Sequence, residues 1–205
     1  TMLSKNIDRS LHPESKEMKL HGRNSSFKDY VGEFVYGGID GSVTTFAVVA
    51  GSAGANLDIS VVLILGFANL IADGFSMSVG NYFSTKTEIE NYNRHKRIEY
   101  WEVENLPEKE KEEIREIYEA KGFDGELLEK VVETITADKD RWVDVMMKEE
   151  LEMQKEERSP LSTAFVTFIS FLVVGLIPLL SYVFSDNTNT ASGRLFMLSC
   201  LFTGL

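Results

Sequence analysis

The sequence predicts an all-α polytopic membrane protein in which a helical cytoplasmic domain is inserted between transmembrane helices. Three apolar stretches, at residues 31–53, 59–83 and 161–184, are long enough to cross a bilayer, which takes about 20 residues of helix. The segment 84–160, between the last two, holds 23 of the 32 acidic residues and 14 of the 21 basic ones. Because apolar and charged residues are separated along the chain, each part is interpreted by itself.

The positions of the basic residues predict which segments face the cytoplasm. Residues 1–28 are polar, contain six Lys and Arg, and lack the apolar core of a signal peptide. The connector 54–58 contains no Lys or Arg, whereas basic residues return soon after the second apolar stretch. Under the positive-inside rule, 1–28 is a cytoplasmic tail, 29–83 forms transmembrane helices 1 and 2, and 84–160 is cytoplasmic.

The first apolar stretch carries acidic residues, although a charged side chain at the bilayer centre costs roughly 2.5–3.5 kcal/mol. Asp40 lies inside the stretch, Glu33 near its start and Asp29 just before it. On a helix these three residues fall within about 40° of one another and form one stripe. We interpret them as candidate residues of a transport path, because intramembrane acids usually face a bundle interior or water. Gly37 and Gly41 of the same stretch suit close helix packing.

The second apolar stretch carries a polar stripe of different chemistry. Asn69, Asp73 and Met77 follow at intervals of four residues and share one helix face. Oxygen ligands alone suit Mg²⁺ or Ca²⁺, whereas an added thioether favours Fe²⁺ and its first-row neighbours. Met77 alone is equally well explained as filler in an apolar helix, but Asp73 has no such explanation.

The remaining apolar stretches are predicted to be scaffold. Residues 161–184 contain Gly175 and Pro178 but no charged side chain. A fourth stretch begins near Leu195 and stops with the sequence at Leu205, which is too short for a helix that crosses a bilayer. We therefore expect 161–205 to hold transmembrane helix 3 and a truncated helix 4.

The charged segment predicts a small bundle of helices. The second transmembrane helix meets no Pro or Gly before Asn105, so we expect it to continue into the cytoplasm. Pro107 suits the first position of the next helix, and Gly122 suits its end. Apolar spacing marks two further helices, at 127–135 and 138–157.

Acidic residues and methionines of this bundle have the spacing of a metal site. On each of three predicted helices, two or three such residues lie within one turn of each other, as in helical bundles that hold metal ions. They are Glu99 and Glu102, Glu110 and Glu113, and Met146, Met147 and Glu150. A solvated helix face with Glu–Lys ion pairs explains the same spacing. The position of the domain next to an acidic path favours the metal-binding interpretation.

Three motifs resemble the vacuolar iron transporter family. They are YGGIDGSVTTFAVVAG around Asp40, ANLIADGFSMSVGNYFSTKTEIE around Met77, and DRWVDVMMKEELE before the third span. They occur in the family's order, and the resemblance covers residues 27–205. It implies a five-span homodimer, here truncated before its last span, that moves cytosolic Fe²⁺ out of the cytoplasm in exchange for protons.

The resemblance also implies roles for individual residues. The metal-binding residues of the family correspond to Glu99, Glu102, Glu110, Glu113, Glu150, Met146 and Met147. Asp40 and Met77 correspond to residues of the membrane path, and Asp29 and Glu33 to acids near its cytoplasmic entrance. Several members have Glu at the position of Asn69, whereas here the acid is Asp73, one turn further along the same face.

Some alternatives stay open at this point. Mn²⁺ accepts the same ligands as Fe²⁺, so the choice of Fe²⁺ as substrate rests on the resemblance. The membrane is a bacterial plasma membrane or a vacuolar one. The alternative function is a membrane-anchored metal-binding protein or ferroxidase. The sequence lacks a Glu-x-x-His motif, which disfavours the ferroxidase. We expect a transporter rather than an enzyme, with no organic cofactor, and the net charge of −11 disfavours nucleic acid as a partner.

Overall fold

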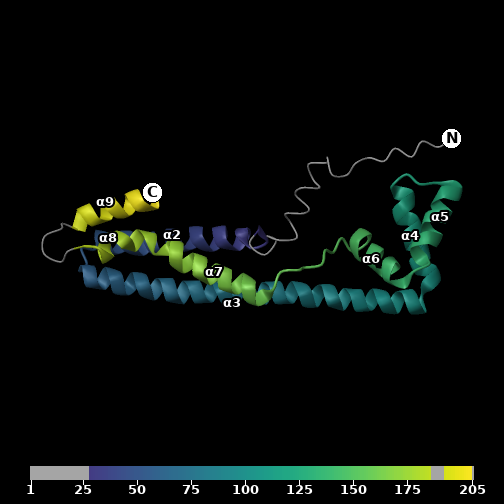
Figure 1. Ribbon diagram of the computed structural model, residues 1–205, viewed down its shortest axis with the longest axis horizontal. Helices are drawn as coiled ribbons and strands as arrows, with labels where there is room; N and C mark the ends of the chain where they lie inside the picture. Colours follow the sequence, from purple (N-terminus) through teal and green to yellow (C-terminus); the bar gives the residue numbers. More distant parts are fainter. Residues whose placement is uncertain (1–27, 186–191, 205) are drawn as a thin grey trace, which may run out of the picture. The chain divides into compact units, whose positions relative to one another are not determined.

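The computed structural model describes residues 28–185 and 192–204, in which every regular element is a helix (Figure 1). The chain divides into two compact units, one formed by Phe83–Glu157 and the other by the residues on either side of that segment. The predicted tail up to residue 27, and residues 186–191 of the connector after the third apolar stretch, lie outside the described residues.

Three helical segments are long and apolar enough to cross a membrane, which confirms the predicted all-α class with several candidate spans. They are α2 (Val31–Gly54), α3 (Ile59–Asn105) and the segment Pro160–Val183. As predicted, α3 continues without interruption to Asn105, and it passes from the first unit into the second.

The third candidate span is not one regular helix. It consists of α7 (Pro160–Gly175), the 3-10 turn η2 (Ile177–Leu179) and α8 (Leu180–Val183). The change of helix type occurs at Pro178, whose nitrogen carries no hydrogen for an α-helical hydrogen bond. The last described helix, α9 (Ser192–Thr203), is apolar but shorter than a membrane span.

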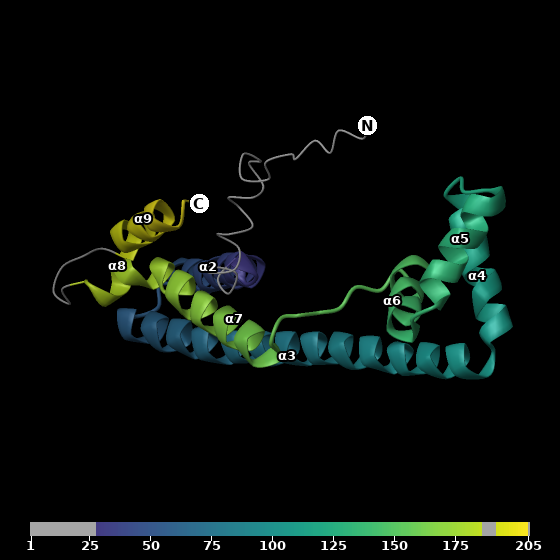
Figure 2. The same cartoon turned by 45° about the vertical axis from the view of Figure 1, so that its right-hand side comes forward.

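Helices α2 and α7 lie side by side at very close range (Figures 1 and 2). A Cβ atom added to Gly37 would lie 2.8 Å from the carbonyl oxygen of Thr167, and one added to Gly41 would lie 2.6 Å from that of Phe171. Gly175 of α7 is equally confined, because its Cβ would lie 2.9 Å from the Gly41 oxygen. The small residues of the first span therefore serve close helix packing.

Helix α3 joins this pair through side-chain hydrogen bonds to α7. The Ser78 hydroxyl donates to the Ala164 carbonyl at 2.8 Å, and the Asn81 amide donates to the Thr167 hydroxyl at 2.7 Å. A buried apolar cluster that includes Leu70 and Phe171 completes the core of this unit.

The second unit is the predicted helical bundle. The end of α3 packs with α4 (Pro107–Ala120), α5 (Gly125–Thr136) and α6 (Lys139–Glu149) around one apolar core. Pro107 begins α4 as predicted, and Gly122 follows its end with a φ of +92°, which an L side chain rarely adopts.

The predicted length of the last bundle helix is wrong. We expected a helix to 157, but α6 ends at Glu149. The backbone N–H groups of Leu151 and Met153 donate to the carbonyls of Met146 and Met147 at 3.2 and 2.8 Å, and Glu152 takes a φ of +51°. These contacts turn the chain away from the helix axis although no Pro or Gly marks the position.

Candidate functional site

Three carboxylates from different parts of the second unit converge on one point. One oxygen each of Glu99, Glu110 and Glu150 lies within 4.8 Å of the other two. Glu99 lies on α3, Glu110 lies in the first turn of α4, and Glu150 is the C-cap residue of α6. A single residue, Leu106, separates α3 from α4, which leaves the end of α3 at a steep angle (Figure 2).

Two of these carboxylates are buried without full hydrogen bonding. The exposed fraction is 4% for Glu99 and 1% for Glu110, and the Oε2 atom of each is buried with no hydrogen-bond partner. A buried polar atom that lacks a partner costs roughly 1–3 kcal/mol, and more when it is charged. The arrangement is therefore unfavourable for the ionised residues alone and would be relieved by a proton or a cation.

The surroundings favour the protonated forms. Burial, and secondarily the neighbouring carboxylates Glu102, Glu113 and Glu150, raise the pKa of Glu99 to about 7. Burial, followed by Glu113, Glu102 and Glu99, raises the pKa of Glu110 to about 7 as well. The pKa of Glu150 is raised for the same reasons. At neutral pH Glu99 and Glu110 are thus close to their titration midpoints, where protons and metal ions compete for the same oxygens.

The geometry fits a single divalent cation. Oxygen ligands lie about 2.0–2.6 Å from an ion such as Mg²⁺ or Ca²⁺, so three oxygens within 4.8 Å of one another can share one ion once they draw slightly closer around it. Glu102 and Glu113 stand close enough to raise the pKa of the buried carboxylates and offer further oxygens.

One lysine at this cluster was not anticipated from the sequence. The Lys109 ammonium donates to Glu113 at 2.7 Å and lies 3.9 Å from Glu110, and it lowers the pKa of Glu99 and Glu110. Its position four residues before Glu113 was a usable signal, but the same spacing also describes an ordinary surface ion pair.

The methionine pair is fully buried. Met146 and Met147 are 0% exposed and lie in the apolar core with Ile114 and Trp142. Packing alone explains this position, and the predicted role of the two sulfur atoms as metal ligands stays a prediction.

The three acids of the first stripe have different surroundings. Asp29 is exposed in a turn before α2, so the helical stripe contains only Glu33 and Asp40 and the expected alignment of all three is wrong. Asp40 is half-buried, whereas Glu33 is buried and forms an ion pair with Arg158. This pair was missed because its partners stand 125 residues apart.

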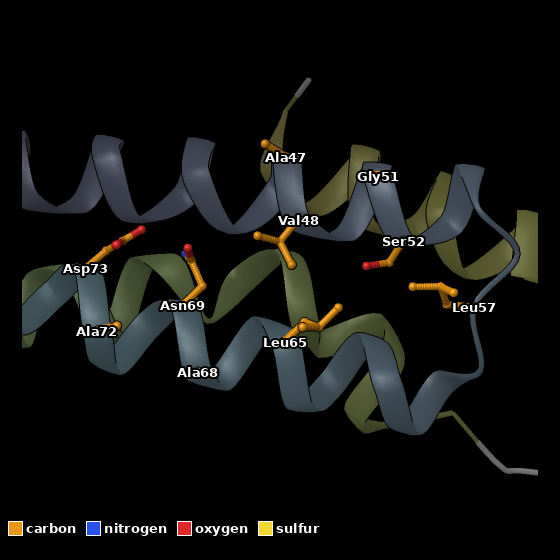
Figure 3. A pocket seen from close by; sticks show the side chains of 10 residues that line it. All are labelled: Ala47, Val48, Gly51, Ser52, Leu57, Leu65, Ala68, Asn69, Ala72 and Asp73. Carbon is orange, nitrogen blue, oxygen red and sulfur yellow. The ribbon is translucent and has the colours of Figure 1, made fainter.

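Asn69 and Asp73 share a cavity between α2 and α3 of about 580 Å³. Figure 3 shows both side chains pointing from α3 toward α2, with Ser52 on the opposite helix. The side-chain nitrogen of Asn69 is buried without a hydrogen-bond partner. Asp40 and Met77 are not among the residues that line this cavity, and Met77 packs against the apolar core instead.

The chain is similar to known vacuolar iron transporters. Residues 31–205 match the VIT family. A vacuolar iron transporter of Toxoplasma gondii is 38% identical over 204 residues, which cover 97% of this chain and 66% of that protein. One from Plasmodium berghei is 33% identical over 205 residues, covering 95% and 75%. Vacuolar iron transporter 1 of Arabidopsis thaliana is 33% identical over 177 residues, covering 85% and 71%.

These relatives are named as transporters and not as enzymes. The chain spans about two thirds of the length of the T. gondii relative. Since the family match extends over most of the sequence, the chain belongs to the VIT family.

Proposed function

We propose that this chain belongs to an iron transporter that moves Fe²⁺ out of the cytoplasm in exchange for protons, with Mn²⁺ as an alternative substrate. The observation that carries the proposal is the convergence of Glu99, Glu110 and Glu150, of which the first two are buried with unpartnered oxygens. The names of the relatives, which are vacuolar iron transporters, support Fe²⁺ as the substrate.

In this proposal residues 84–160 form a cytoplasmic domain that collects the metal. Glu102, Glu113, Met146 and Met147 complete the ligands around the three converging carboxylates. The excess of acidic residues raises the local concentration of cations near the site. Because the pKa of two of the carboxylates is about 7, binding of a divalent cation at neutral pH also releases protons.

From the domain the metal passes along residues of the apolar helices. The proposed path includes Asp29 and Glu33 at the cytoplasmic entrance and Asp40, Asn69, Asp73 and Met77 deeper in the membrane. A membrane carboxylate is unfavourable when it is charged and empty, so either a metal ion or a proton must occupy it. This competition is the physical basis of the proposed exchange of Fe²⁺ for H⁺.

We further propose an integral membrane homodimer with its N-terminus on the cytoplasmic side. The large exposed side chains of α2 and α3, among them Tyr36 at 63%, Ile39 at 61% and Ile64 at 67%, support insertion in a membrane. Apolar faces of this extent are suited to lipid or to a second copy of the chain. The cytoplasmic N-terminus rests on the basic residues before the first apolar stretch. The membrane is a bacterial plasma membrane or a vacuolar membrane.

The test is Fe²⁺ uptake into proteoliposomes that hold the protein from its complete reading frame, with acid or neutral interiors. The proposal predicts uptake that is faster with the acid interior and absent from empty vesicles. Oxygen consumption with Fe²⁺ but no flux would instead support a membrane-anchored ferroxidase. Equal flux with and without the gradient would contradict proton exchange.

A further inference from the structure

Arg158 forms an ion pair with Glu33, the acid proposed for the entrance of the path. Its guanidinium donates a hydrogen bond to Oε1 of Glu33, which lies in the first turn of α2. The Glu33 side chain is 10% exposed and that of Arg158 is 35% exposed. Both residues belong to the same compact unit, where Arg158 is the first residue after the inserted segment.

A second contact holds the same piece of chain. The backbone N–H of Ser159 donates to the phenol oxygen of Tyr30 at 3.1 Å. Tyr30 precedes Glu33 by three residues, so two neighbouring residues before α7 are held by two residues one turn apart at the start of α2.

The helices behind this contact fix its geometry. Glu33, Gly37 and Gly41 follow at intervals of four on α2, which places Glu33 in line with the glycines that contact α7. The Ser170 hydroxyl of α7 also donates to the Phe34 carbonyl. Because the two backbones are this close, the residues just before α7 lie next to the start of α2, and Arg158 reaches Glu33.

The ion pair leaves one oxygen of Glu33 unused. Arg158 bonds to Oε1, whereas Oε2 is buried and has no hydrogen-bond partner. A buried carboxylate with only one of its oxygens engaged retains affinity for another cation. This unpartnered oxygen indicates that Glu33 binds a ligand in addition to, or in place of, the guanidinium.

We propose that Arg158 is a tethered counter-ion of Glu33 that a divalent metal ion displaces and a monovalent ion does not. The inference rests on the proposed function and makes Arg158 a specificity-determining residue of the entrance. At equal distance a divalent ion gains about twice the Coulomb energy of a monovalent one. Fe²⁺ therefore competes with the guanidinium for Glu33, whereas the monovalent K⁺ does not displace it.

The test compares Fe²⁺ uptake by full-length wild type and Arg158→Gln in about 0.15 M K⁺ or in equal N-methylglucamine, a cation too bulky for the site. Equal ionic strength removes screening as an explanation. Wild type has the same KM for Fe²⁺ in both salts. Arg158→Gln has a lower KM in N-methylglucamine, and K⁺ raises that KM by about threefold or more because the Glu33 carboxylate, without its counter-ion, attracts K⁺. Arg158→Lys restores a tethered charge and the insensitivity to K⁺.

A purely structural ion pair makes different predictions. It predicts that Arg158→Gln lowers the amount of active protein while the KM stays independent of K⁺, and this result would overturn the proposal. Should Arg158→Gln not fold, the charge swap Glu33→Lys with Arg158→Glu keeps the pair. Our proposal predicts a raised KM for the swap, and a wild-type KM would overturn it. Failure of the proposed function itself appears separately, as a lack of Fe²⁺ flux in wild type.

Discussion

Glu99 and Glu110 approach each other from two helices, and each buries a carboxylate oxygen that has no hydrogen-bond partner. Their nearest neighbours at the site are further carboxylates, and Lys109 is the cation that lowers their pKa. The pair is consequently least stable when both residues are ionised. Its need for a proton or a metal ion is a property of the fold, from which the first two predictions follow.

Glu110→Gln should stabilise the metal-free protein at high pH. The folded-state pKa of Glu110 is raised from 4.5 to about 7, so folded protein holds this proton more tightly than unfolded protein does. The resulting stability is complete below pH 4.5 and is lost as the pH rises through about 7. Gln keeps the neutral form, so the variant should gain roughly 2–3 kcal/mol in free energy of unfolding above neutral pH.

The measurement is urea or thermal unfolding in detergent at several pH values, without metal. Glu116→Gln, at an exposed position of the same helix, is the matched control and should show no gain. A gain for Glu110→Gln that is equal at acid and alkaline pH would refute the electrostatic explanation.

Lys109→Gln should move metal binding to higher pH. Lys109 lowers the pKa of Glu99 and Glu110, so its removal raises both values and protons compete more strongly with the metal. The affinity for Mn²⁺, which is stable in air, is measured across neutral pH by calorimetry. Lys111→Gln is the control, because Lys111 pairs with the exposed Glu108. An unchanged pH midpoint for Lys109→Gln would argue against its electrostatic role.

Gly41→Ala should destabilise the protein, whereas Gly51→Ala should not. A Cβ at Gly41 would lie 2.6 Å from the Phe171 carbonyl oxygen, while nothing lies within 4 Å of one at Gly51. Both positions are helical, so Ala brings the same gain in helix propensity of about 1 kcal/mol. Only at Gly41 is that gain opposed by an overpacking cost of roughly 1–3 kcal/mol. Thermal unfolding in detergent distinguishes the pair, and equal effects would contradict the described packing of α2 on α7.

Asp40→Asn should separate metal collection from transport. Asp40 is half-buried on α2, away from the Glu99 cluster in sequence, and Asn cannot exchange a proton for a metal ion. Fe²⁺ flux into vesicles should fall at least about tenfold, equivalent to about 1.4 kcal/mol. Binding of Fe²⁺ to the purified protein should persist. Asp58→Asn in the connector before α3 is the control, and flux retained by Asp40→Asn would exclude Asp40 from the path.

Much of the fold could be predicted from local sequence. The start of α4 and the extension of α3 follow from apolar length and from the positions of Pro and Gly. The end of α6 could not, because it depends on carbonyls of Met146 and Met147 that accept bonds from beyond the helix. Chain turns of this kind carry no residue-type signal.

The candidate site was predictable in part. Spacing on each helix selected Glu99, Glu110 and Glu150, which the fold brings together. Spacing does not report on contacts between distant segments, so it missed the Glu33–Arg158 pair. It also placed Asp29 on a helix that starts only at Val31. Which carboxylates are buried, and hence which titrate near neutral pH, depends on tertiary packing.

The most direct test of the account is the number of protons released when Fe²⁺ binds to the purified full-length protein at pH 7 without oxygen. Titration in two buffers of different ionisation enthalpy gives both this number and the affinity. We predict about one proton released per ion in wild type, and a loss of affinity of at least about tenfold with little proton release in Glu99→Gln with Glu110→Gln. Unchanged affinity and proton release in the double variant would show that the metal binds elsewhere.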